Sequence, residues 1–272
     1  MKVKSLSKLT HHLLANGKYF FSKEFAASEL NISDVALRLQ ILRLKKKKAI
    51  YSLWRGFYMI IPAEFTHIGS VPPLWLIDPL MKYLGHSYYI GLLSSSSIYG
   101  VTQQQPQIFQ VMCSAQIPTI ELPRGLIRFH YSKYLSKALV ESIKTPTSYA
   151  VIATKEQTAL DLVKFYKSCG YFSNVATILS ELSLELDANL LLKVLTNEKS
   201  PSHLQRLGYI LEVLGFDQLA SIAETALKKD WGSGDNIHQI CYRKLRPDLA
   251  TKEQTKSSRW KLIINDHIEI DE

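Results

Sequence analysis

The stretch from Ser22 to Pro62 reads SKEFAASELNISDVALRLQILRLKKKKAIYSLWRGFYMIIP and decides the fold of the first part of the chain. Its first residue can cap a short helix, because a serine hydroxyl accepts a hydrogen bond from a first-turn amide that has no partner in the helix. An Asn31-Ile32 turn follows. Ser33 and Asp34 then start a second helix, where an acidic side chain also suits the positive end of the helix dipole. Two helices joined by so short a turn predict a helix-turn-helix.

Apolar residues of the second helix recur at helical spacing. Val35, Leu39 and Leu42 are four and three residues apart, which predicts that this stripe faces the core. Polar residues lie largely off the stripe, among them Arg38 and Gln40. They are therefore expected to face outward, where a binding partner can reach them.

Two short strands after the second helix complete the motif. They are predicted at about 49–53 and 57–61, joined by Trp54-Arg55-Gly56, and a loop with a terminal glycine is typical of a hairpin. Together these elements predict a winged helix-turn-helix, in which the second helix lies in the major groove of DNA. The residues predicted to contact DNA are Ser22, Lys23, Ser33, Asp34, Leu37, Arg38, Gln40, Arg43, Lys45, Lys46, Lys47, Lys48 and Arg55.

The charge of the chain is concentrated in the same segment. Residues 1–62 contain twelve Lys and Arg against three Asp and Glu, whereas residues 63–272 contain 21 of each. The whole formal charge of +9 therefore belongs to the first 62 residues. Such a local excess is the electrostatic signature of a polyanion-binding module. The alternative is a basic helical hairpin that only packs against the rest of the chain, because charge runs on helices commonly face solvent.

Length and composition indicate a globular protein of two or three domains. The chain has 272 residues, of which 46% are hydrophobic and 21% charged. No apolar run approaches the roughly 18 residues of a membrane span, and the N-terminus is too polar for a signal peptide. Cys113, Cys169 and Cys241 are odd in number and far apart, which argues against a disulfide framework. A cytoplasmic protein without membrane contact is expected.

The flanking segments predict an α+β fold in three parts. Residues 1–62 form the winged helix-turn-helix, with a first helix around Leu6–Leu14. Residues 63–153 form a small α+β domain, and residues 154–272 form a mainly helical region whose first helix begins with a Thr154–Gln157 capping box.

The later elements are also predicted from apolar spacing and turn residues. In the middle domain, helices are expected at 74–84 and 86–100, strands at 107–112 and 148–153, and a hairpin at 119–131. The C-terminal helices are expected at about 173–184, 187–196, 201–214 and 216–229, followed by a turn at 231–235 and closing strands within 260–270.

The sequence carries few signs of catalytic chemistry. Ser94–Ser97 lack the G-x-S-x-G turn of a nucleophile elbow. Gly232-Ser233 is followed by Asp235 and Asp248, but the paired acidic residues of a nucleotidyltransferase metal site are missing. Glu269 and Asp271 alternate on the last predicted strand, where a solvated edge strand is favoured over a metal site. No catalytic residue, metal ligand or cofactor is predicted.

The order of several short motifs resembles one family, the AbiEi-type antitoxins of bacterial abortive-infection (type IV toxin–antitoxin) operons. The motifs cover nearly the whole chain. They are Arg55–Tyr58 with the Ile61-Pro62 exit, Tyr88–Ser94, Tyr99-Gly100, Gln104–Pro106, Phe109–Val111, Thr154–Val163 and the Trp260 strand.

The resemblance implies both a DNA partner and a protein partner. The N-terminal domain would bind inverted repeats in the protein's own promoter and repress it. The C-terminal part would counter a toxin similar to nucleotidyltransferases, without a stable complex being needed. Two alternatives stay open: a winged-helix regulator that senses a small molecule, and a nucleic-acid-processing enzyme with unrecognised catalytic residues.

Overall fold

The computed structural model describes residues 5–102, 107–231, 240–250 and 255–269. The chain folds into two compact units. The first holds the residues up to Tyr89 together with Gln107–Leu135 and Ser142–Val151, and the second holds the rest. The predicted boundary after residue 62 falls inside the first unit, and the three-part division stays a prediction.

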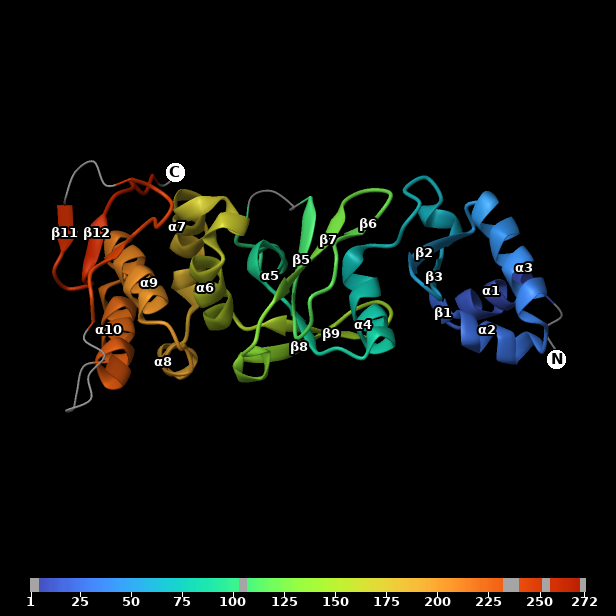
Figure 1. Ribbon diagram of the computed structural model, residues 1–272, viewed down its shortest axis with the longest axis horizontal. Helices are drawn as coiled ribbons and strands as arrows, with labels where there is room; N and C mark the ends of the chain where they lie inside the picture. The colour runs from blue at the N-terminus through green and yellow to red at the C-terminus, as the bar shows by residue number, and fades with distance from the viewer. Residues whose placement is uncertain (1–4, 103–106, 232–239, 251–254, 270–272) are drawn as a thin grey trace. The chain divides into compact units, whose positions relative to one another are not determined.

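Among residues 5–60, the structure contains three helices and a three-stranded sheet (Figure 1). The helices are α1 (Leu6–Ala15), α2 (Lys23–Leu30) and α3 (Asp34–Lys46). Strands β1 (Phe20–Ser22), β2 (Ile50–Trp54) and β3 (Phe57–Ile60) form an antiparallel sheet in the order β1-β3-β2. Their buried core consists of Leu6, Leu9, Leu13, Phe21, Ala26, Leu37, Ile41, Leu44, Ile50 and Ile60.

A serine hydroxyl caps the N-terminus of each of these three helices. Ser5 accepts a hydrogen bond from the amide of Lys8, Ser22 from that of Phe25, and Ser33 from that of Ala36. Each cap satisfies a first-turn amide that the helix cannot pair. The caps predicted at Ser22 and Ser33 are confirmed.

The middle of the chain contains a six-stranded mixed sheet. Its order is β6-β7-β5-β4-β9-β8, with β5 parallel to β7 and β6 antiparallel to β7. The short helix α5 (Leu92–Ile98) follows β4, and α4 (Pro73–Leu84) precedes it. The strand bounds are Tyr88–Ile90 (β4), Ile108–Cys113 (β5), Ile120–Glu121 (β6), Leu126–Tyr131 (β7), Val140–Lys144 (β8) and Tyr149–Ala153 (β9).

One prediction for this region needs correction, and one strand was not predicted. The helix predicted over 86–100 is wrong, because Tyr88–Ile90 is a strand and only Leu92–Ile98 is helical. All three residues of that strand are buried, so the run lacks the alternation that marks a half-exposed strand. The strand β8 has no counterpart among the predicted elements, because most of its residues are exposed and its sequence carries no apolar pattern.

The C-terminal region consists of helices and a small sheet. The helices are α6 (Lys155–Lys164), α7 (Tyr171–Leu182), α8 (Ala188–Thr196), α9 (Pro201–Val213) and α10 (Asp217–Trp231), which confirms the helices predicted there. The sheet has the order β10-β12-β11, from Arg243–Lys244, Leu262–Ile264 and Thr255–Ser257 (Figure 1). The motif at 104–106 and the features predicted at 232–235 and 271 lie outside the described residues.

Candidate nucleic-acid interface

The turn between α2 and α3 sets the direction of the second helix. Asn31 ends α2 in the left-handed conformation, with φ of 49°, and its amide bonds to the carbonyl of Ala27. Asparagine tolerates this conformation better than most residues with a Cβ. The hydroxyl of Ser33 then caps the start of α3. Both serines predicted to contact DNA, Ser22 and Ser33, therefore use their hydroxyls as helix caps.

The buried face of α3 is not the one that apolar spacing predicted. Leu37, Ile41 and Leu44 are the buried residues of this helix. Val35, Leu39 and Leu42, predicted to face the core, are instead 68%, 52% and 55% exposed. Because α3 is apolar on two sides, spacing alone cannot decide which side packs.

One predicted DNA contact is wrong for the same reason. The side chain of Leu37 is 0% exposed and belongs to the core of the N-terminal helices. It cannot reach a ligand unless that core opens. Its neighbour Arg38, by contrast, has a side chain that is 68% exposed.

An ion-pair network lies at the first turn of α3. Asp34 pairs with Lys23 of α2, and its Oδ2 lies 2.8 Å from Nε of Arg38. The hydrogen bond from Lys23 lowers the pKa of Asp34, although desolvation opposes this shift, and the charge of Arg38 lowers it further. Asp34 is therefore ionised at neutral pH, and it positions two cations rather than presenting a free acid to a polyanion.

The remaining predicted cations lie on the surface. Arg43 and Lys45–Lys48 are exposed at the C-terminal end of α3 and in the turn after it. Lys48 takes a left-handed conformation with φ of 54°, which directs the chain from the helix into β2. Exposed lysines at such a turn can reach phosphates without disturbing the core.

The hairpin loop that carries the exposed Arg55 is held by a residue of α4. The hydroxyl of Tyr83 donates to the carbonyl of Arg55 at 2.9 Å, and its ring stacks on Phe57 with 4.7 Å between centroids. Desolvation raises the pKa of Tyr83, and the charge of Glu24 acts in the same direction. A Cβ at Gly56 would lie 2.8 Å from the Tyr83 hydroxyl, so this close approach requires glycine. No sequence signal points to Tyr83, because its partner is 28 residues away.

Gln40, another predicted DNA contact, is engaged inside the N-terminal fold. Its Oε1 accepts a hydrogen bond from the amide of Leu6 at 2.7 Å, and so helps to cap α1. The side chain is only half-exposed. A role in stability is therefore expected for Gln40 in place of base contact.

Arg38→Ala and Gln40→Ala are expected to affect different properties: the first DNA sequence preference, the second the stability of the fold. Losing Arg38 should reduce discrimination between a specific and a random duplex by about 1–3 kcal/mol, with little change in stability. Losing Gln40 should lower the free energy of unfolding by about 0.5–1.5 kcal/mol, because the Leu6 amide loses its partner, and leave sequence preference unchanged. Gel-shift titrations and thermal unfolding of both variants measure the difference. A Gln40→Ala chain of normal stability and relaxed preference would contradict these assignments.

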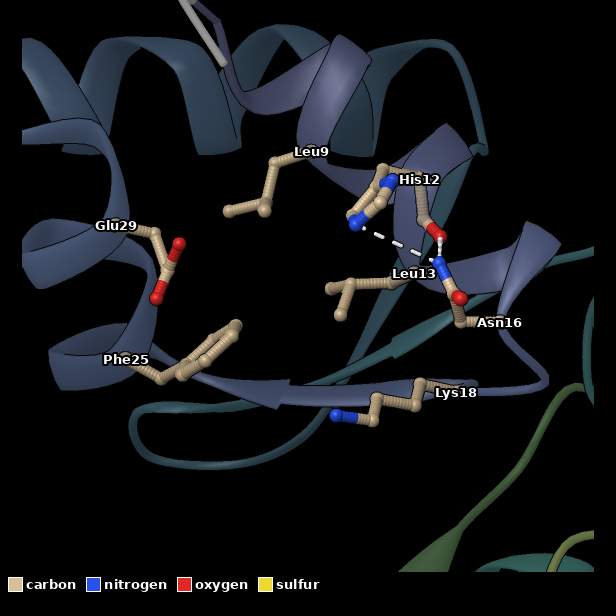
Figure 2. Close-up of a pocket in the computed structure, with 7 residues that line it drawn as sticks. All are labelled: Leu9, His12, Leu13, Asn16, Lys18, Phe25 and Glu29. Atoms are coloured by element: carbon tan, nitrogen blue, oxygen red, sulfur yellow. Dashed lines mark hydrogen bonds between the residues drawn. The ribbon is translucent and has the colours of Figure 1, made fainter. Parts of the chain in front are cut away.

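A pocket of about 470 Å³ lies between α1 and α2 (Figure 2). Leu9, Leu13 and Phe25 form its apolar lining, and His12 and Glu29 face each other across it. Inside the pocket wall, the Asn16 amide donates to the backbone carbonyl of His12 at 2.7 Å. All of its lining residues lie between Leu9 and Glu29, in the N-terminal helices and the turn between them.

The polar residues considered for catalysis have structural partners. Ser95 and Ser96 of α5 are fully buried, and both hydroxyls donate to the carbonyl of Leu92. Ser95 also accepts a hydrogen bond from Thr158 of α6. Asp161 of α6 is buried, and its carboxylate accepts a hydrogen bond from the side-chain amide of Gln157.

The described part of the chain shows neither a metal cluster nor a membrane span. There, no group of three or more His, Cys, Asp or Glu side chains has the arrangement of a metal site. No helix among the same residues combines the length and apolar character needed to cross a membrane.

Comparison with known proteins gives one family and one fold. Residues 89–213 match the model of the AbiEi antitoxin C-terminal domain, which confirms the resemblance over this segment. The crystal structure of the RV2827C protein from Mycobacterium tuberculosis superposes with a TM-score of 0.65 at 14% identity, covering 94% of this chain and 89% of that one. At this identity the likeness is one of fold. No curated protein matches the sequence.

Proposed function

We propose that this chain is a DNA-binding antitoxin. Its residues 89–213 match the AbiEi antitoxin C-terminal domain. The first 62 residues act as a winged helix-turn-helix that binds inverted repeats in the promoter of the protein's own operon and represses it. The C-terminal region counters a toxin similar to nucleotidyltransferases. The protein acts in the cytoplasm, and its activity does not depend on catalysis.

The observation that carries the DNA-binding part is the position of the charge. The whole excess of +9 lies in residues 1–62, and Arg38, Arg43 and Lys45–Lys48 are exposed on or just after one helix. Arg55 is exposed on the hairpin that follows. A helix entering the major groove with a basic hairpin beside it fits this arrangement, because both phosphate walls of the groove then meet cations.

The antitoxin part rests on the family match rather than on a site. The matched segment runs from β4 to α9. A buried hydrogen bond from Thr158 of α6 to Ser95 of α5 joins two of its helices, and the Gln157–Asp161 bond lies within α6. The Thr158–Ser95 bond favours one packing of α5 against α6. A rigid, non-catalytic body of this kind suits an antitoxin that works by binding or by opposing the toxin's target.

Two measurements on the full-length chain test the proposal. The first is binding to a duplex from its own promoter and to a shuffled duplex, without divalent metal. Preference for the promoter and repression of a promoter–reporter fusion are expected. The second is growth of cells that express a nucleotidyltransferase-like toxin with and without this chain, where rescue is expected. Equal binding to both duplexes would refute autorepression, and failed rescue by a folded chain would refute the antitoxin role.

A further inference from the structure

The outward face of α3 carries three aliphatic side chains in a row. Val35, Leu39 and Leu42 are each more than half exposed, and their spacing of four and three residues aligns them along one side of the helix. A single exposed leucine is ordinary, but an aligned set marks a surface that has a partner. This set lies apart from the buried Leu37, Ile41 and Leu44.

The charges around this stripe decide what the partner can be. Arg38, Arg43 and Lys45 are exposed along its sides, and the exposed Lys46 follows it at the end of the helix. The nearby Asp34 is already paired with Lys23 and Arg38. A two-fold contact with a second copy would bring these cations against their own equivalents, which opposes association. The complementary surface is therefore anionic at its edges and apolar along its centre.

The major groove of DNA is anionic at its edges, and it is apolar along its centre where thymines occur. Phosphates form both walls, and the 5-methyl group of thymine is an apolar group on the groove floor. From Val35 to Leu42 the helix makes seven residue-to-residue steps and advances about 10 Å, which is about three base-pair steps. One α-helix fits this groove.

We propose that Val35, Leu39 and Leu42 recognise the methyl groups of thymines in the major groove. The DNA that this chain selects therefore carries thymines, on either strand, within the base pairs that α3 faces. This inference deepens the proposed function and rests on it. Sequence preference at these positions comes from aliphatic contact, while the surrounding cations hold the helix in the groove.

The test replaces thymine by deoxyuridine, which lacks only the 5-methyl group. The full-length chain first selects duplexes from a random pool, and each thymine of the selected site is then replaced singly. At contacted positions the affinity is expected to fall about fourfold per methyl group, whereas replacements in flanking DNA leave it unchanged. Leu39→Ala and Val35→Ala, both at exposed positions, should each abolish the penalty at one thymine.

The outcomes separate the inference from the function on which it rests. Selection of a defined site with equal affinity for thymine and deoxyuridine at every position would overturn methyl recognition and leave DNA binding intact. Failure to select any site would refute the proposed function itself. If the alanine variants keep the deoxyuridine penalty but lose self-association or toxin rescue, the stripe binds protein, and methyl recognition by it is wrong.

Discussion

A variant in which Lys45, Lys46, Lys47 and Lys48 are all glutamine is expected to bind every duplex about a thousandfold more weakly at about 0.15 M salt. Each phosphate contact releases counterions and contributes about 0.9 to the slope of log affinity against log salt. Four such contacts account for a slope change of about 3.6 and for the thousandfold loss. Because phosphates carry no sequence information, specific and random duplexes should lose affinity alike.

The chain offers a matched control for this experiment. Lys133, Lys144, Lys193 and Lys229 are also exposed but lie in the part of the chain whose charges balance. Changing these four to glutamine lowers the net charge by the same amount, and the salt slope should stay at its original value. If both quadruple variants bind alike, only net charge matters, and the cationic end of α3 is not a phosphate-binding site.

The N-terminal fold shows where sequence periodicity stops being informative. Helix caps at Ser22 and Ser33, the short turn and the hairpin follow from local chemistry, and the structure contains them. The side of α3 that packs does not follow, because Val35, Leu39 and Leu42 and the set Leu37, Ile41 and Leu44 both have helical spacing. The choice depends on the surfaces that α1 and α2 present, which are tertiary information.

The candidate interface, too, could be predicted from the sequence only where it depends on local pattern. The exposed positions of Arg38, Arg43 and Lys45–Lys48 agree with the prediction that charged side chains point outward. The partners of Gln40 and Arg55 could not be predicted, because the Leu6 amide and Tyr83 are 34 and 28 residues away in the sequence. Long-range polar contacts of this kind leave no local pattern. These contacts also distinguish residues that stabilise the fold, such as Gln40, from exposed residues that are available to bind a partner.

In the C-terminal region, the contact between Trp260 and Gly208 is expected to contribute strongly to stability. Trp260 is fully buried, and its indole lies directly against Gly208 of α9, where a Cβ would come within 2.1 Å of the ring. The indole N–H donates to Glu212, and Arg259 lies over the ring with 5.0 Å to its centroid. Trp260 thereby joins the strands after residue 240 to a helix inside the family-matched segment.

Trp260→Ala is expected to lower the free energy of unfolding by about 3–5 kcal/mol, because it leaves a large cavity beside α9. Gly208→Ala should cost about 1–3 kcal/mol by overpacking, and the double variant should cost less than the sum, because the cavity accommodates the new methyl group. Urea unfolding followed by far-UV circular dichroism measures all three variants. Leu184→Ala is the control, since that side chain is 76% exposed and should change stability by less than about 0.5 kcal/mol. Strictly additive costs for the two substitutions would show that the indole does not rest on Gly208 in solution.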